Sequence, residues 1–178
     1  SSDVQDTFNM VSVDGDTSTN DMVAILANGL AGNAEIASEG EDFENFMRAL
    51  NTVTVHLCRC IAGDGEGATK LLECCSSLLK AAMFGADANW GRVLCAIGYS
   101  GAKVDIGKVG VAFRSRAGMV RVCEMGAGIP FSEEEAKAVL SEDEIEILVS
   151  LGDGEASATA WGCDLTYDYV KINGDYRT

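Results

Sequence analysis

A chain of 178 residues with 47% hydrophobic residues can bury a core as one domain or two small ones. Its formal net charge of −15 repels phosphate backbones, which disfavours nucleic acid as a partner but is compatible with cationic amine substrates. There is no signal-peptide pattern and no apolar run of about 18 residues or more, so we expect a cytoplasmic protein with no membrane partner.

The first 63 residues predict a short strand followed by two helices. Phe8 to Val13 read as a strand, and the polar residues 14–17 form a tight turn after it. Ser18 with Asp21 matches a capping box, and apolar residues on one helical face predict a helix over 22–30. A longer stripe predicts a second helix that ends near Gly63, with members Phe43, Phe46, Met47, Leu50, Val53, Leu57 and Ile61.

The next segment carries an unusual junction. Residues 69–73 read as a strand, yet the Cys74–Cys75 pair leads directly into another apolar segment without Gly, Pro, Asn or Asp. A chain reversal needs such turn residues, so we expect residues to be absent from this sequence at that point. Farther on, Asp87 or Asn89 is placed to cap a helix that contains Val93 and Ile97.

The last 70 residues alternate between strand and helix patterns. Residues 109–113 and 120–122 predict a hairpin that turns near Gly118, and residues 145–151 predict another strand. Ser132 with Glu135 predicts a capped helix over 133–140, and Asp164 is placed to cap a final helix over 165–176. Strands mixed with helices without strict alternation indicate an α/β or α+β fold.

Cysteine and histidine do not form a recognisable metal or redox motif. The cysteines at positions 58, 60, 74, 75, 95, 123 and 163 lack Cys-x-x-Cys spacing, and His56 is the only histidine. The segment Asp14-x-Asp16-x-Ser18 opens like a calcium loop, but its sixth position lacks the required glycine. We therefore expect reduced thiols and no bound metal.

The glycine-rich segment Asp64-Gly-Glu-Gly-Ala-Thr-Lys70 is the clearest candidate site. It is not a phosphate loop, because its lysine follows threonine where that motif has Gly-Lys-Ser/Thr. Glu66 stands between two residues without side chains, so its carboxylate can approach a ligand closely and bind an ammonium group. Composition alone favours the alternative, a solvated glutamate in a turn.

Four segments together resemble the β chain of the ornithine acetyltransferase family, the self-cleaving glutamate N-acetyltransferases of arginine biosynthesis. They occur in the family's order and are Asp14-Gly-Asp-Thr-Ser-Thr-Asn-Asp21, Asp64-Gly-Glu-Gly-Ala-Thr-Lys70, Asp87-Ala-Asn-Trp-Gly-Arg92 and residues 161–178. The resemblance implies a layered fold like that of the N-terminal-nucleophile enzymes, shared with an α chain from the same precursor. It places residues 1–70 in the nucleophile-bearing core and residues 71–178 in a C-terminal α+β domain with a tail that returns to the active site.

The resemblance also implies a reaction and its residues. Acetyl would pass from N-acetylornithine to glutamate through an acetyl-threonine enzyme, with acetyl-CoA as an optional co-substrate and no other cofactor. Glu66, Asn173 and Thr178 match the family's substrate-binding positions. The nucleophilic N-terminal threonine has no counterpart at Ser1, so we expect it upstream of this residue and no catalytic residue within the sequence. The expected assembly is an α2β2 heterotetramer of autocatalytically cleaved chains.

Two other functions fit the same residues. An N-terminal-nucleophile amidase or aminopeptidase would pass the acyl group to water, and a scaffold subunit would only support its partner chain. Formation of acetylglutamate separates the transferase from the amidase, and the mass of the small subunit tests the scaffold.

Overall fold

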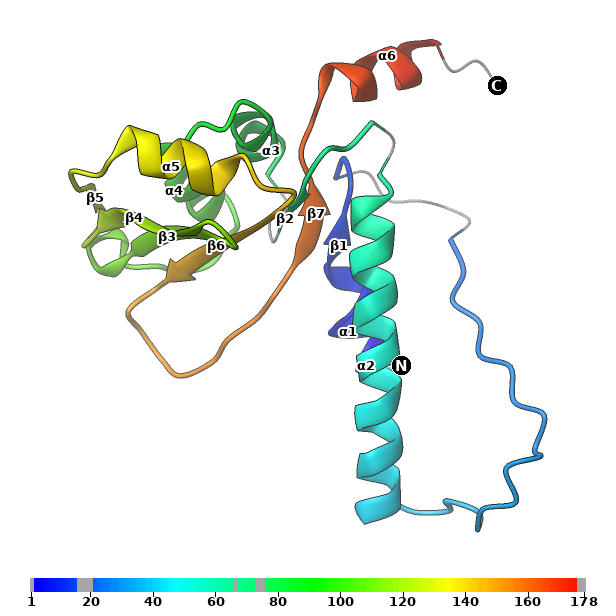
Figure 1. Cartoon of the computed structure of the whole chain (residues 1–178). Helices are drawn as coiled ribbons and strands as arrows, with labels where there is room; N and C mark the ends of the chain where they lie inside the picture. Colours follow the sequence, from blue (N-terminus) through cyan, green and yellow to red (C-terminus); the bar gives the residue numbers. More distant parts are fainter. Residues whose placement is uncertain (1, 16–20, 66, 73–75, 176–178) are drawn as a thin grey trace.

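The protein forms a mixed α/β structure in which seven strands of the described chain make one sheet (Figure 1). This computed structural model describes residues 2–15, 21–65, 67–72 and 76–175. The strand order is β1-β7-β2-β6-β3-β4-β5. The strands are β1 (Val11–Ser12), β2 (Leu71–Leu72), β3 (Gly110–Ser115), β4 (Gly118–Glu124), β5 (Ala127–Gly128), β6 (Glu144–Ser150) and β7 (Trp161–Cys163). The predicted fold class is confirmed.

Strand β2, third in the sheet order, has only two residues and joins β7 to β6. It runs parallel to β6, with Leu72 opposite Ile145, and antiparallel to β7, with Leu72 opposite Gly162. On the outer side of β7, β1 pairs in parallel and brings residues near the start of the chain beside residues near its end. This crossing of distant segments positions the candidate site.

The hairpin, the 133–140 helix and the 145–151 strand are confirmed. Phe113 of β3 lies between Val120 of β4 and Ile147 of β6, as antiparallel partners. Helices α3 (Ser77–Phe84), α4 (Trp90–Gly98) and α5 (Glu133–Leu140) lie on one face of these strands (Figure 1). Their apolar residues and those of the strands form one core, whose fully buried members include Leu79, Met83, Phe113, Val122 and Leu140.

Two helix starts in this region have the expected caps. The Ser132 hydroxyl accepts a hydrogen bond from the Glu135 backbone N–H at 3.2 Å, at the start of α5. Of the two candidates for α4, Asn89 provides the cap, because its side-chain oxygen accepts from the Arg92 N–H at 3.1 Å. Such caps stabilise a helix start by about 1 kcal/mol.

The N-terminal region contains a short helix α1 (Ser2–Gln5), a 3₁₀ turn (Phe8–Met10) and the long helix α2 (Glu41–Gly63). The predicted long helix is confirmed, but its apolar stripe is not the surface that packs on the sheet. Cys58 and Ala62 are buried against Trp161 of β7, in a second small core. The stripe itself is largely exposed, with Phe46, Val53, Leu57 and Ile61 each 45–56% accessible.

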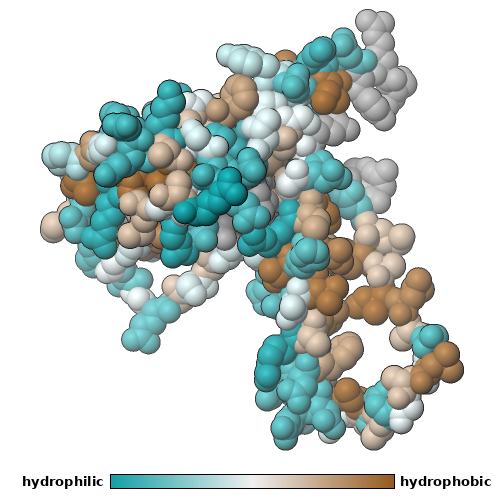
Figure 2. Space-filling view, viewed as in Figure 1, coloured by the Kyte–Doolittle hydropathy of each residue, from teal (hydrophilic) through white to brown (hydrophobic). Residues whose placement is uncertain are grey.

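The predicted helix over 22–30 is wrong for the residues that the structure describes. Residues 21–28 have no regular secondary structure, and the segment runs as an open arc beside α2 (Figure 1). The proposed Ser18 cap lies outside the described residues. Residues 21–40 are all exposed, with Leu26 97% accessible, and Figure 2 shows hydrophobic surface along this arc and α2. The periodic apolar residues of this segment are therefore ones that this chain does not bury by itself.

The described helices give no candidate membrane span, since none combines the necessary length and apolar character. The division of the chain into two domains, residues 1–70 and 71–178, stays a prediction.

Candidate functional site

The glycine-rich segment links α2 to β2 and is tightly packed on both sides. A Cβ atom on Gly67 would lie 2.6 Å from the Tyr169 backbone N and 2.8 Å from the Asp168 carbonyl carbon. Gly67 also has a φ of +72°, which side chains disfavour. A Cβ atom on Gly65 would lie 2.9 Å from the Cys163 sulfur. Both glycines are therefore required by contact with β7 and with the start of the final helix.

The final helix, α6 (Tyr167–Asp175), begins directly against this segment. The predicted cap at Asp164 is wrong, because Thr166 performs that role: its hydroxyl accepts from the Tyr169 backbone N–H at 3.1 Å. The same hydroxyl donates to the Gly67 carbonyl at 2.5 Å. Thr166 is only 5% accessible, and its two partners, Gly67 and Tyr169, are half-buried.

Asp164 instead holds the second half of the glycine-rich segment. One carboxylate oxygen accepts from the backbone N–H groups of Thr69 and Lys70 at 2.8 and 3.0 Å. The other accepts from the Thr69 hydroxyl at 2.5 Å. Asp164 is 1% accessible, and a buried carboxylate needs such bonds to offset the loss of water. This arrangement fixes residues 69 and 70 to the end of β7.

Two lysines connect the segment and β1 to the C-terminal helices. The Lys70 ammonium donates to the carbonyls of Met83 and Leu140, at the ends of α3 and α5, at 2.5 and 2.7 Å. Burial lowers the pKa of Lys70 from 10.5, and the nearby Asp164 charge opposes that shift. Lys80, which is 1% accessible, donates from α3 to the Ser12 and Val13 carbonyls at 2.6 and 2.8 Å.

The structure places one of the three predicted substrate-binding residues. Asn173 is exposed on α6, one turn beyond Tyr169, and its side-chain amide donates to the Tyr169 carbonyl at 2.9 Å. Glu66 and Thr178 lie outside the described residues. However, Gly67, the residue after Glu66, contacts the first turn of α6, so the structure brings the glycine-rich segment and the Asn173 helix together. The Tyr169 hydroxyl also reaches Asp14, donating to its carboxylate at 3.0 Å.

Sequence reasoning missed the residues that hold this site together. The sequence predicted a helix cap at Asp164. It did not reveal that Asp164 binds Thr69, which lies 95 positions earlier. Lys80 was not singled out, although a lone cation within the apolar run Leu78-Leu-Lys-Ala-Ala-Met83 is a recognisable signal of a buried, paired charge. Thr166 gave no signal beyond its polar side chain.

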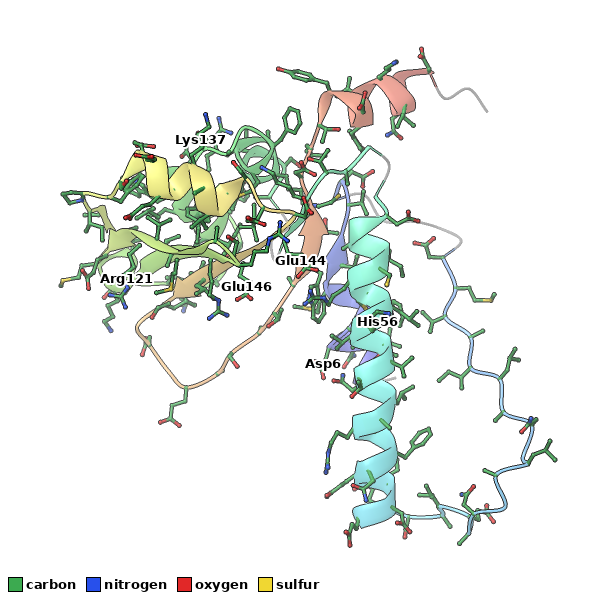
Figure 3. All side chains as sticks on the ribbon, viewed as in Figure 1. Asp6, His56, Arg121, Lys137, Glu144 and Glu146 are labelled. Carbon is green, nitrogen blue, oxygen red and sulfur yellow. The ribbon has the colours of Figure 1, made fainter. Side chains whose placement is uncertain are left out.

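A cavity of about 530 Å³ lies elsewhere, between the sheet and α2. Arg59 of α2 pairs with Glu144 of β6 at 2.8 Å, and Arg114 pairs with Glu146. Figure 3 shows these two glutamates on β6 and His56 on α2. None of the lining residues belongs to the glycine-rich segment or α6. The exposed, mutually paired charges make this a polar surface and not part of the candidate site.

Metal binding finds no support in the part of the chain that the structure describes. There, no three His, Cys, Asp or Glu side chains are grouped so as to hold a metal ion. His56 is exposed, with its Nε2 atom 3.6 Å from the Cys60 sulfur. Burial raises the pKa of the Cys163 thiol beside the glycine-rich segment, and the Lys80 charge partly opposes that effect. A protonated thiol is a poor nucleophile, so Cys163 fills space between the segment and β7.

Comparison with known proteins identifies the family. The ArgJ family model matches residues 1–75 and 74–178, and the chain belongs to this family. It is 50% identical to the arginine biosynthesis bifunctional protein ArgJ 1 of Clostridium acetobutylicum, over 98% of this chain and 48% of that protein. It is 48% identical to the glutamate N-acetyltransferase of Methanopyrus kandleri, over 98% of this chain and 49% of that protein. The chain thus spans about half the length of these curated relatives.

A solved structure has the same fold. The crystal structure of the arginine biosynthesis bifunctional protein ArgJ from Bacillus halodurans superposes with a TM-score of 0.91 at 43% identity. The match covers 98% of this chain and 90% of that chain. This agreement shows that the chain has the fold of that protein.

The relatives contain residues that this chain lacks. The alignment with the Clostridium protein has 194 positions against 178 residues here, so at least 16 positions have no counterpart in this chain. The family match divides at residues 74 and 75, where the sequence predicted absent residues. Residues 73–75 lie outside the described part of the structure. The division of the family match therefore supports that prediction.

Proposed function

We propose that this chain is the β chain of a glutamate N-acetyltransferase that takes acetyl from N-acetylornithine. The observation that carries the proposal is the packing of the glycine-rich segment around Glu66 against the first turn of the helix that bears Asn173. The names of the relatives support the same chemistry, since they include bifunctional ArgJ proteins and a glutamate N-acetyltransferase. The chain spans about half of their length, and we propose that a second chain supplies the rest of the enzyme.

In the proposed reaction, a threonine outside residues 1–178 attacks the acetyl carbonyl of N-acetylornithine through its hydroxyl oxygen. The free α-amine of that threonine has a pKa near ~8 and accepts the hydroxyl proton. The C–N bond breaks, ornithine leaves with the proton, and the acetyl group remains as an ester. The amine of glutamate then attacks this ester, which forms N-acetylglutamate and regenerates the threonine. Water must be kept from the ester, since hydrolysis would waste the acetyl group.

In this proposal the β chain binds the amino-acid part of both substrates. The Glu66 carboxylate accepts a hydrogen bond from an amino group of the substrate, and this bond is charge-assisted where that group is an ammonium. Asn173 offers both a donor and an acceptor, which suits an α-carboxylate, and Thr178 adds a hydroxyl group. Asn173 lies on an exposed face of α6, where its amide can exchange the Tyr169 carbonyl for a ligand.

The exposed apolar surface supports the proposed partner chain. Phe46, Val53, Leu57 and Ile61 share one face of α2, and Leu26 lies on the neighbouring arc. An exposed apolar surface of this extent is typical of a protein interface. We propose that the α chain of the same autocatalytically cleaved precursor covers it and that two such pairs form an α2β2 heterotetramer. We also propose that the enzyme is cytoplasmic and that it can use acetyl-CoA as a second acetyl donor.

A labelled substrate tests this function. The complex of this chain with its partner is incubated with N-acetylornithine that carries ¹³C in the acetyl group, with glutamate or with glutarate, which has no amine. We expect labelled N-acetylglutamate with glutamate and an acetylated enzyme without an acceptor. Label found only in free acetate would favour the amidase, and intact substrate in all samples would favour the scaffold.

A further inference from the structure

The Thr166 hydroxyl makes two hydrogen bonds that belong to different structural elements. It donates to the Gly67 carbonyl in the glycine-rich segment, and it accepts from the Tyr169 N–H in the first turn of α6. An ordinary helix cap satisfies only its own helix. Here, one nearly buried oxygen atom links the residue after Glu66 to the helix that carries Asn173.

The surrounding contacts make this link tight. Gly67 lies so close to Asp168 and Tyr169 that a methyl group would not fit between them. Two residues before Thr166, the Asp164 carboxylate binds the backbone of Thr69 and Lys70. A stretch of three residues, 164–166, therefore fixes both the glycine-rich segment and the start of α6. A shift of one element must move the other.

We propose that Thr166 is a positioning residue that holds residues 67–70 of the glycine-rich segment against the start of the helix that bears Asn173. The inference rests on the proposed function for what this region binds, namely the amino-acid part of the substrates. A site whose contacts come from two separate elements keeps its geometry only while those elements stay in one relative position, and the shared hydroxyl supplies that constraint.

The experiment compares three variants in the complex of this chain with its partner. Thr166→Val keeps the shape and removes the hydroxyl, whereas Thr166→Ser keeps the hydroxyl. Ser132→Ala removes a comparable cap from α5, at the end of that helix opposite its contact with Lys70. Two quantities are measured for each variant: hydrogen exchange of residues 67–70 and 169–173, and the separate kcat and KM values for glutamate.

We expect Thr166→Val to accelerate exchange in both segments together, by roughly fivefold to tenfold. It should raise the KM for glutamate by a similar factor and lower kcat less. Thr166→Ser should retain wild-type values, and Ser132→Ala should change neither the exchange of these segments nor KM. Faster exchange in residues 169–173 alone would show an ordinary helix cap and overturn the proposal, as would an unchanged KM in an active Thr166→Val complex.

Two further outcomes remain decisive. If Thr166→Val does not fold, exchange in the wild-type complex is followed against denaturant concentration. Residues 67–70 and 169–173 should then open with one common dependence, and separate dependences would overturn the coupling. If the wild-type complex transfers no acetyl group, the proposed function fails, and the exchange measurements alone decide whether Thr166 couples the two elements.

Discussion

The C-terminal sheet region and the N-terminal region around α2 use apolar residues in opposite ways. Strands β3, β4 and β6 bury theirs under α3, α4 and α5, so that Phe113 and Leu140 are fully inaccessible. Helix α2 and residues 21–40 have similar apolar content but leave most of it in contact with solvent. The first region is complete within this chain, and the second has the composition of an interface. The candidate site lies where the two regions meet.

Removal of a core side chain should give the largest effect. Leu140→Ala deletes a fully buried side chain, so we expect a loss of about 2–5 kcal/mol in the free energy of unfolding. Leu26→Ala changes a residue that is 97% accessible and should cost less than about 0.5 kcal/mol. Denaturant unfolding of this chain expressed by itself measures both. Equal losses would mean that the N-terminal region packs like the C-terminal one.

A charge on the exposed stripe of α2 should disrupt partner binding. Val53→Asp places a carboxylate in the middle of this stripe, and we expect affinity for the partner chain to fall by about 100-fold. Thr52→Asp is the matched control, because Thr52 is also exposed but is turned by about 100° around the helix from Val53. Titration of the partner chain gives the affinities. A similar loss in both variants would point to a general effect of charge and remove the stripe from the interface.

Crowding at the junction of the two regions should make substitution of Gly67 more destabilising than substitution of Gly154. Gly67 and Gly154 have nearly the same positive φ, +72° and +75°, but only Gly67 has close neighbours. Gly154→Ala should therefore cost about 1–2 kcal/mol from backbone strain alone. Gly67→Ala adds the clash with Asp168 and Tyr169. We therefore expect it to cost at least roughly 1 kcal/mol more stability than Gly154→Ala and to remove activity. Thermal unfolding and the acetyl-transfer assay compare them; equal losses would show that the contact is absent in solution.

The smallest expected effect concerns the buried thiols of both regions. Burial raises the pKa of Cys58 and Cys123 above the ordinary value of 9.0. Above that pH the thiols of the unfolded chain ionise first, so each thiol lowers stability by up to about 1.4 kcal/mol per pH unit. The lowered pKa of Lys70 acts in the opposite direction up to pH 10.5. Replacing both cysteines with alanine should flatten the fall in stability above pH 9.0 under reducing conditions; an unchanged slope contradicts this.

Local signals in the sequence were sufficient for several elements of both regions. The hairpin, α5 with its Ser132 cap and α2 were predicted because their periodicity and caps depend on neighbouring residues. The helix over 22–30 was predicted wrongly because its apolar residues have no surface to pack against within this chain. Periodicity reports that residues will be buried, but not by which chain.

The candidate site was only partly predictable for a related reason. The glycine-rich segment and Asn173 were found through their resemblance to a family. Asp164 and Lys80 act on residues 95 and 68 positions away, and no local pattern encodes such contacts. The same holds for Thr166, whose hydroxyl reaches Gly67 across 99 residues. Fold topology brings these side chains to their partners, so only the structure reveals their roles.

Substrate binding by the glycine-rich segment is tested most directly by Glu66→Ala in the complex with the partner chain. Loss of one charge-assisted hydrogen bond should lower kcat/KM for glutamate and for N-acetylornithine by roughly 10- to 100-fold, with little change in unfolding temperature. Glu155→Ala, in the exposed loop before β7, is the matched control and should retain wild-type values. Unchanged kinetic constants in a folded Glu66→Ala complex would contradict the assignment of this segment as the substrate-binding element.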